Sequence, residues 1–261
     1  MLILACDTSN TACSVCLYED GRVLAQSLLS IGKQTHSLTF MPMVHDLMIR
    51  SGREYKDLDA FACAVGPGSF TGIRIGVSAV KSMAMVIEKP AVPVSSLKAL
   101  AFPFLDFKNT LVVAMTDARN RRVFSTAYYE GQEVISENAR TIDELIILCS
   151  TWEEIEGTSD TSILLCGDIA STYAKEEYFF KKRASVPMLF GREVQPASVA
   201  ALAFETISRT ENLLETFPAK DLSPVYRAKT AAERMFPKAS ENKDEKEPEN
   251  IFPSEESGKH A

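Results

Sequence analysis

The feature that most constrains the fold of this chain is an internal repeat. LILACDTS at residues 2–9 resembles LVVAMTDAR at 111–119, because each is an apolar strand that ends in an aspartate. A second strand and a turn ending in glycine follow each copy, and the distance from Asp7 to Gly21 equals that from Asp117 to Gly131, 14 residues in each case. A repeat of this kind indicates the architecture before any single element does.

The predicted elements keep the same order in both copies. After the glycine come a third strand (22–27 and 133–137), a helix (38–50 and 142–152) and an apolar strand ending in glycine (60–66 and 163–167). Asp-Gly between alternating runs predicts a hairpin, and a helix followed by a strand supplies the crossover of a mixed sheet. We therefore predict an α/β protein of two lobes with duplicated β-β-β-α-β units and mixed sheets. This is the plan of actin, sugar kinases and Hsp70, in which the lobes face a nucleotide cleft.

The expected division of the chain follows from this repeat. Residues 1–108 form the first lobe and 109–236 the second, with a helix at 196–215 near its end. Residues 237–261 are polar and rich in Pro and Glu, and cannot bury enough apolar surface to offset ordering entropy, so we expect a disordered acidic tail. The net charge of the chain is −7. No global positive field is present to hold a polyanion, so tight tRNA binding by the chain alone is not expected.

The apolar segments and the cysteines indicate the compartment. The first residues lack a basic signal-peptide region, and no stretch reaches the ~20 apolar residues that span a bilayer. We expect a cytoplasmic protein without membrane contact. The six cysteines lie mostly in apolar runs, where reduced thiols pack as small hydrophobes. Cys13 and Cys16 match C-x-x-C within a predicted strand, but no second pair completes a zinc site.

The segment GPGSFTGIRIG at 66–76 carries the most information about function. A glycine-rich loop between a strand and a helix can offer backbone N–H groups to a phosphate, although this one matches neither the P-loop nor G-x-G-x-x-G. The alternative is packing, with Gly72, Gly76 and Ala79 or Val80 as a small-residue face and Thr71 as the helix cap. Both interpretations stay open on the residues alone. The nucleotide or phosphate hypothesis involves Asp7, Gly66, Gly68, Ser69, Thr71, Gly72 and Asp117.

The helix at 38–50 has more apolar residues than one core-facing stripe needs, and a second helix with Met83 and Met85 follows at 72–87. Pro42 fits the first helix only if it falls in the first turn. The apolar excess indicates a partner surface, and the alternative is a helix enclosed within its own domain. The predicted interface consists of Leu38, Met41, His45, Met48, Gly72, Gly76, Val80 and Met83.

Metal binding and phosphoryl transfer find little support in the sequence. His36 and His45 are nine residues apart, on opposite sides of any shared helix, and H-E-x-x-H does not occur. We expect no metal site, with His36 before a helix start and His45 partly buried. Asp7 and Asp117 stand where kinases of this fold hold Mg²⁺-nucleotide, but a full set of groups for phosphoryl transfer is not identified. Three basic clusters are expected to be solvated turns, and the alternative is contact with tRNA phosphate at the edge of a complex. They are Arg119-Arg121-Arg122, Lys181-Lys182-Arg183 and Arg227-Lys229-Arg234.

GPGSFTGIRIG, preceded by LILACDTS and the hairpin ACSVCLYEDG, resembles the signature of the TsaB (YeaZ) family. QTHS at 34–37, DAR at 117–119 and PVYR at 224–227 extend the resemblance from residue 1 to about 236. It implies an actin-like relative of TsaD with no catalytic residues of its own. Such a protein pairs with TsaD through the two helices, forms homodimers with the same surface, and acts with the ATPase TsaE in forming threonylcarbamoyladenosine in tRNA. ATP or ADP and tRNA would then be bound only in the complex.

Two rival functions remain from other classes of protein. One is an active nucleotide-dependent enzyme of the sugar-kinase and actin fold that uses Asp7, Asp117 and the glycine loop. The other is an M22-type metallopeptidase. Metal analysis and ATP turnover would separate both from a scaffold.

Overall fold

The computed structural model describes residues 1–30, 36–157, 161–181, 183–188 and 190–227. The predicted disordered tail at 237–261 lies outside the described residues, as does the end of the predicted second lobe at 228–236.

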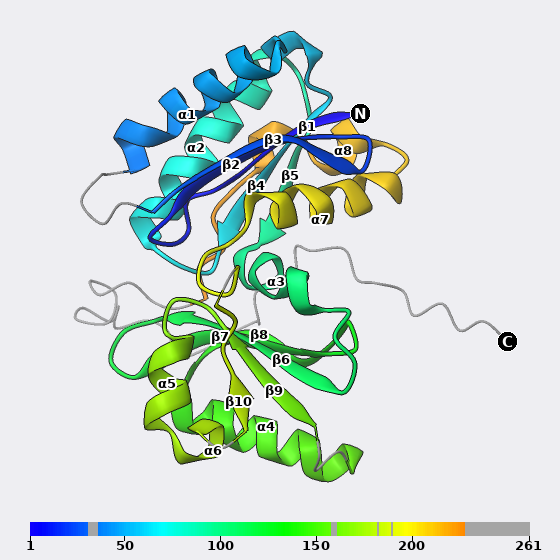
Figure 1. Ribbon diagram of the computed structural model, residues 1–261. Coiled ribbons are helices and arrows are strands. Elements are labelled where there is room, and N and C mark those ends of the chain that lie inside the picture. The colour runs from blue at the N-terminus through cyan, green and yellow to red at the C-terminus, as the bar shows by residue number, and fades with distance from the viewer. Residues whose placement is uncertain (31–35, 158–160, 182, 189, 228–261) are drawn as a thin grey trace, which may run out of the picture.

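Two five-stranded mixed sheets form the two lobes, one above the other (Figure 1). The first sheet has the order β3 (Arg22–Leu29), β2 (Cys13–Glu19), β1 (Leu2–Asp7), β4 (Ala60–Gly66) and β5 (Ala91–Ser95). The second has the order β8 (Gln132–Thr141), β7 (Arg122–Tyr129), β6 (Thr110–Asp117), β9 (Ser162–Cys166) and β10 (Ala184–Ser185). In each, the central strand is antiparallel to the next strand in sequence and parallel to the fourth. The predicted duplication is confirmed.

The hairpins have the geometry that their sequences predict. Asp20 and Gly21 have φ of 46° and 83°, and Glu130 and Gly131 have φ of 47° and 82°. A two-residue hairpin turn with positive φ at both positions matches the right-handed twist of the strands, and Gly at the second position adopts this backbone without a steric penalty.

The helices α1 (His36–Ser51) and α2 (Phe70–Val86) cover the outer face of the first sheet. The short helix η1 (Tyr55–Asp57) follows α1 in the chain, and β5 follows α2. Two expectations about these helices are wrong. Pro42 lies in the second turn of α1, because the helix begins at His36 and not at 38. The N-cap of α2 is Ser69 and not Thr71, since the Ser69 hydroxyl accepts a bond from Gly72 N–H at 3.2 Å.

The helices α3 (Ser96–Ala101) and α7 (Pro196–Ser208) lie between the two sheets in one apolar core, whose strand residues include Ala5 and Val94 from the first sheet and Val112 and Leu164 from the second. The predicted helix at 196–215 was placed in the second lobe, and this is wrong. It ends at Ser208, and α7 contacts all five strands of the first sheet. The assignment of 109–236 to one lobe therefore fails for this segment.

The remaining elements complete the two lobes. On the second, α4 (Ile142–Glu156) begins with a capping box between Thr141 and Glu144, and α5 (Ala170–Glu176) and α6 (Tyr178–Lys181) follow β9. The turn η2 (Phe102–Phe104) leads into β6, while α8 (Leu213–Thr216) and η3 (Ala219–Asp221) follow α7. None of the helices within the described part of the chain is long and apolar enough to cross a membrane.

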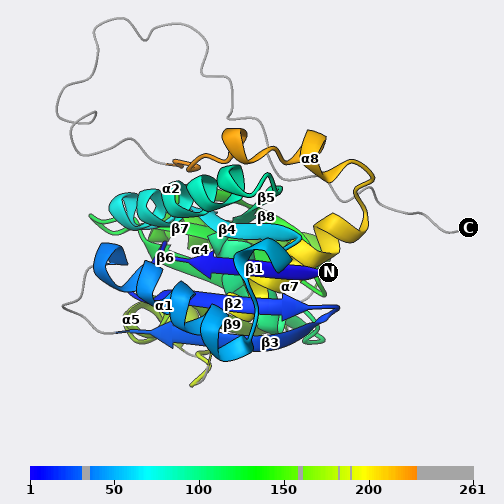
Figure 2. The same ribbon diagram turned by 90° about the horizontal axis from the view of Figure 1, so that it is seen from above.

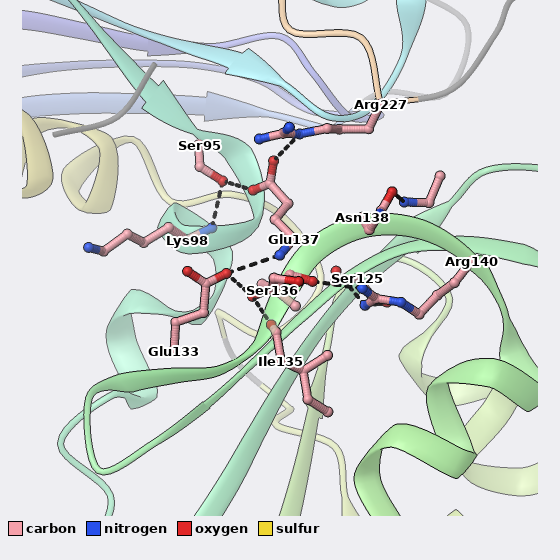
Figure 3. Close-up of polar contacts among 12 residues, drawn as sticks. Ser95, Lys98, Ser125, Glu133, Ile135, Ser136, Glu137, Asn138, Arg140 and Arg227 are labelled. Carbon is pink, nitrogen blue, oxygen red and sulfur yellow. Dashed lines mark hydrogen bonds and ion pairs between the residues drawn. The ribbon is translucent and has the colours of Figure 1, made fainter. Parts of the chain in front are cut away.

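The C-terminal segment at 219–227 returns along α2, which lies between it and α1 (Figure 2). Its last described residue, Arg227, forms an ion pair with Glu137 of β8 at 3.1 Å (Figure 3). The other carboxylate oxygen of Glu137 accepts a hydrogen bond from the hydroxyl of Ser95, the N-cap of α3. These polar contacts join the two lobes beside the shared apolar core.

Candidate functional site

The glycine loop at the end of β4 is packed against the chain itself. A Cβ at Gly66 would lie 2.7 Å from the carbonyl oxygen of Val225, whose N–H donates to Val65 O at 2.8 Å. A Cβ at Gly68 would overlap Ser9 O, which accepts a bond from Ser69 N–H at 2.7 Å. The loop is held between the C-terminal segment and the turn after β1, and glycine is required because both neighbours are backbone.

Gly72 and Gly76 extend this packing along α2. A Cβ at Gly72 would overlap the carbonyl oxygen of Thr8, and one at Gly76 would overlap its hydroxyl. The Thr8 hydroxyl donates to Gly72 O at 2.7 Å. The predicted small-residue face exists, but it meets the end of β1. Gly72 and Gly76 were predicted to contact another chain, and this is wrong. The same holds for Val80, which lies on the same face of α2 and is fully buried.

Asp7 lies at the centre of this arrangement, fully buried at the end of β1. Its Oδ1 accepts bonds from the N–H and the hydroxyl of Ser9, at 3.0 and 2.5 Å. Its Oδ2 has no partner among the described residues. Burial raises the pKa of the Asp7 carboxyl to about 6, because desolvation disfavours the charged form more than the Ser9 hydrogen bonds favour it.

Further buried polar atoms surround Asp7. Asn10 Nδ2 and Ser14 Oγ also lack partners within the described ranges, while Asn10 O is 2.8 Å from His36 Nε2 at the start of α1. The sequence predicts a nucleotide or phosphate site at this place, but the residues here do not fit a phosphate. The space beside the glycines is occupied by Thr8, Ser9 and Val225, and the carboxyl group of Asp7 is buried next to them. We derive no phosphoryl-transfer step from them.

Asp117 occupies the equivalent end of β6 in the other lobe, and it is exposed. Its Oδ1 accepts from Arg119 N–H at 2.7 Å, and its own N–H donates to Asp168 Oδ1 at 3.3 Å. No hydrogen bond or ion pair within the described part of the chain joins Asp117 to Asp7. The sequence analysis missed Asp168, whose pKa burial raises to about 6. Its only sequence signal is its position after the glycine that ends an apolar strand.

The two histidines among the described residues both lie on α1. His36 is half-buried and is the first residue of the helix, not a residue before it as predicted, and His45 is exposed, not partly buried as predicted. Across the described residues, no group of three or more His, Cys, Asp or Glu side chains is placed to hold a metal ion. Cys13 and Cys16 are buried in β2 with free thiols, as the strand prediction implies.

The basic clusters take part in ion pairs with the chain itself. Arg121 pairs with Glu177 at 2.7 Å, and Arg183 pairs with Glu153 at 2.7 Å. The Arg227 side chain is only 12% exposed in its pair with Glu137, so the prediction of a solvated turn is wrong there. Positions 182, 229 and 234 of these clusters lie outside the described residues.

The outer surfaces of α1 and α2 carry exposed apolar side chains. Because β3 and β4 both run parallel to β1, the two helices begin at the same sheet edge and run side by side (Figure 1). The exposed side chains, here called the outer helix face, are Leu38, Met41, His45, Ile49, Met85 and Val86.

This surface corrects the predicted interface. Leu38, Met41 and His45 are exposed as an interface requires, and Met83 is half-buried. Met48 is only 2% exposed and packs in the core of the first lobe, whereas its neighbour Ile49 is 64% exposed. Met48 therefore belongs to the core and not to the interface.

Comparison with known proteins gives consistent matches. Residues 29–255 match the family model described as TsaD, tRNA N6-adenosine threonylcarbamoyltransferase. The chain is 39% identical over 137 residues to the tRNA threonylcarbamoyladenosine biosynthesis protein TsaB of Escherichia coli, a match covering 52% of this chain and 58% of that protein. It is 31% identical over 242 residues to TsaB of Haemophilus influenzae, covering 87% and 93%. The solved structure of YeaZ from Pseudomonas aeruginosa superimposes with a TM-score of 0.66 at 27% identity, covering 86% of this chain and 99% of that one.

The match to the E. coli relative spans less than two thirds of its length, whereas the H. influenzae match is nearly complete. The YeaZ structure shares the actin-like fold described above.

Proposed function

The chain belongs to the TsaB family, within the wider family that the TsaD model describes, and from this we propose that it is a non-catalytic scaffold subunit in forming threonylcarbamoyladenosine in tRNA. In this proposal it binds a TsaD-type transferase and supports it together with a TsaE-type ATPase. The same surface forms a homodimer when the partner is absent. Transfer RNA and nucleotide are bound by the assembled complex.

The observation that carries the proposal is the outer helix face. Leu38 is 73% exposed, Ile49 64% and Val86 81%, on two helices that lie side by side. Exposing large apolar side chains to water is unfavourable, and covering them with a partner is stabilising. Helices packing with helices across such a face would give an interface of the kind that the family resemblance implies.

The closed glycine loop supports the absence of independent chemistry. Its glycines make room for the chain's own backbone, and the carboxylate beside them is enclosed. A protein that transferred a group by itself would need these positions open to its substrate.

The test compares two isoleucines of nearly equal exposure. Ile49 of α1 is 64% exposed and Ile147 of α4 is 63% exposed. Ile49→Arg should remove binding to the TsaD-type chain of the same organism and abolish tRNA modification in the reconstituted system, because a charge is placed in an apolar contact. Ile147→Arg, on the opposite lobe, should leave both unchanged. Equal binding of the two variants to the transferase would reject the outer helix face as the interface.

The rival functions have their own measurements. The purified chain is expected to turn over no ATP, to carry no stoichiometric transition metal and to modify no tRNA unaided. Modification without a TsaD-type chain would overturn the scaffold proposal. ATP turnover that Asp7→Asn abolishes would support the nucleotide-dependent enzyme.

A further inference from the structure

Three side chains form an exposed stack at the start of α2. The rings of Phe70 and Tyr226 have centroids 4.7 Å apart at an interplanar angle of 30°. The guanidinium carbon of Arg74 lies 3.9 Å from the Phe70 centroid, and Arg74 Nε donates to the Tyr226 hydroxyl at 2.7 Å. Phe70 and Tyr226 are each more than one third exposed. Phe70 and Arg74 belong to the motif GPGSFTGIRIG, and Tyr226 belongs to PVYR. The proposed function assigns no role to these three side chains.

The stack fixes the orientation of the Arg74 guanidinium. Stacking on Phe70 orders its plane, and the hydrogen bond to Tyr226 occupies Nε. The two Nη atoms then remain available, and their N–H groups can donate two parallel hydrogen bonds to a carboxylate. Arg74 forms no ion pair with any described Asp or Glu, so these N–H groups meet no anion within the described part of the chain. The Tyr226 hydroxyl, which accepts from Nε, keeps its own proton to donate.

The surroundings of Arg74 suit a side chain of another protein. Beside it is a hollow of about 400 Å³ lined by Phe70, Thr71, Arg74, Ile75 and Ser78, which contains one cation and otherwise apolar or hydroxyl groups. The hollow lies beside the first half of α2, the helix whose last turn carries Met85 and Val86 of the outer helix face. A partner that packed along the whole length of α2 would cover both places and exclude water from the guanidinium, and a charge-assisted pair is stronger where water is excluded.

We propose that the cradle of Phe70, Arg74 and Tyr226 receives a carboxylate side chain of the TsaD-type partner. This inference rests on the proposed function, since it adds a polar anchor to the same interface. A protein carboxylate fits better than RNA phosphate, because binding a polyanion depends on several cations and the chain has a net charge of −7. Arginine and aromatic residues are also the side chains that most often dominate the energy of protein interfaces.

The experiment measures the affinity of the full chain for the TsaD-type chain of the same organism, by calorimetry with the purified proteins. Arg74→Met should weaken binding by at least about ten-fold, because the partner carboxylate is left without its pair. Arg74→Lys should recover little of the loss, since an ammonium supplies no bidentate edge and stacks poorly. Tyr226→Phe, which keeps the ring and removes the hydroxyl, should give a smaller loss of the same kind.

Arg50→Met is the matched control. Arg50 is an exposed arginine on α1 that is already paired with Asp46 at 2.7 Å. Because an exposed ion pair contributes little free energy, its replacement should change the affinity less than two-fold. Circular dichroism establishes that each variant is folded. A scan of the partner's Asp and Glu residues should find one whose replacement by Asn or Gln adds nothing to Arg74→Met, which is the signature of direct coupling.

The outcomes separate this inference from the proposed function. If Ile49→Arg abolishes binding and Arg74→Met leaves it unchanged, the interface stands and the carboxylate anchor is rejected. If Arg74→Met lowers affinity for a tRNA anticodon stem-loop but not for the TsaD-type chain, the cradle is an RNA site and the inference is overturned. If wild-type chain does not bind the transferase at all, both proposals fail.

Discussion

Arg227 Nε lies 3.1 Å from Glu137 Oε1, and this pair joins the end of the C-terminal segment to the second lobe. Both side chains are at most 12% exposed. Burial raises the pKa of Glu137 above its usual value, although the Ser95 hydroxyl and Arg227 each act to lower it. Burying the Glu137 carboxylate is unfavourable by itself, and the hydrogen bond from Ser95 and the contact with Arg227 offset that cost. Removing the pair therefore tests how strongly it holds the two lobes together.

Arg227→Met should destabilise the protein by about 3–5 kcal/mol, because it leaves the Glu137 carboxylate buried without its cation. Urea unfolding at pH 7 measures this change. Arg50→Met removes an exposed pair and should cost less than about 1 kcal/mol under the same conditions. Equal effects of the two replacements would mean that the inter-lobe pair is as weak as a surface one.

Asp7 predicts a specific dependence of stability on pH. Its folded-state pKa is about 6 against 3.8 in the unfolded chain, so the folded protein binds this proton more tightly. The stability that this group contributes is complete below about pH 4 and is lost as the pH rises through 6, by about 3 kcal/mol. Asp7→Asn should remove that part of the slope.

Asp168 titrates in the same range for the same physical reason, so Asp168→Asn supplies a comparison from the other lobe. Each single variant should reduce the slope of the unfolding free energy between pH 4 and 7, and the double variant should reduce it further, by about the sum of the two single effects. A slope unchanged by Asp7→Asn would show that this carboxyl titrates normally.

Gly76→Ala tests which neighbour the small-residue face of α2 meets. The added methyl group would overlap the Thr8 hydroxyl, so we expect a loss of about 1–3 kcal/mol despite the better helix propensity of alanine. Ser78→Ala, on the exposed side of the same helix, should be neutral or slightly stabilising. Thermal unfolding by circular dichroism distinguishes the two. If Gly76→Ala left the stability unchanged but weakened binding to the partner, Gly76 would belong to the interface after all.

Met48 and Ile49 provide a paired test on α1. Met48→Ala should destabilise the chain by about 2–5 kcal/mol, because it leaves a cavity in the core of the first lobe. Ile49→Ala should change stability by less than about 0.5 kcal/mol, since the side chain is 64% exposed. Denaturant midpoints of the free chain measure both effects. The reverse order would mean that α1 turns its other side to the sheet.

The fold was predictable where local chemistry determines it. The Asp20-Gly21 and Glu130-Gly131 turns, the strand-ending aspartates and their equal spacing were sufficient to predict two equivalent sheets. The partners of the helices were not predictable. The apolar residues of α7 indicate burial but do not specify which sheet buries them. Gly72 and Gly76 form the same small face whether the neighbour is Thr8 or another chain. Met48 and Ile49 are similar in character, and only the placement of α1 on β2 assigns one to the core.

The return of α7 to the first sheet makes the first lobe a discontinuous unit with the second lobe inserted in its sequence. During synthesis on the ribosome the strands of the second lobe emerge before residues 196–208, which complete the packing around the first sheet. The second lobe can therefore form its outer core early, whereas the inner face of the first sheet is covered only in part, by α3, until α7 has been made. A nascent chain stalled before residue 196 should expose that face to chaperones and proteases, although all five of its strands have already been made.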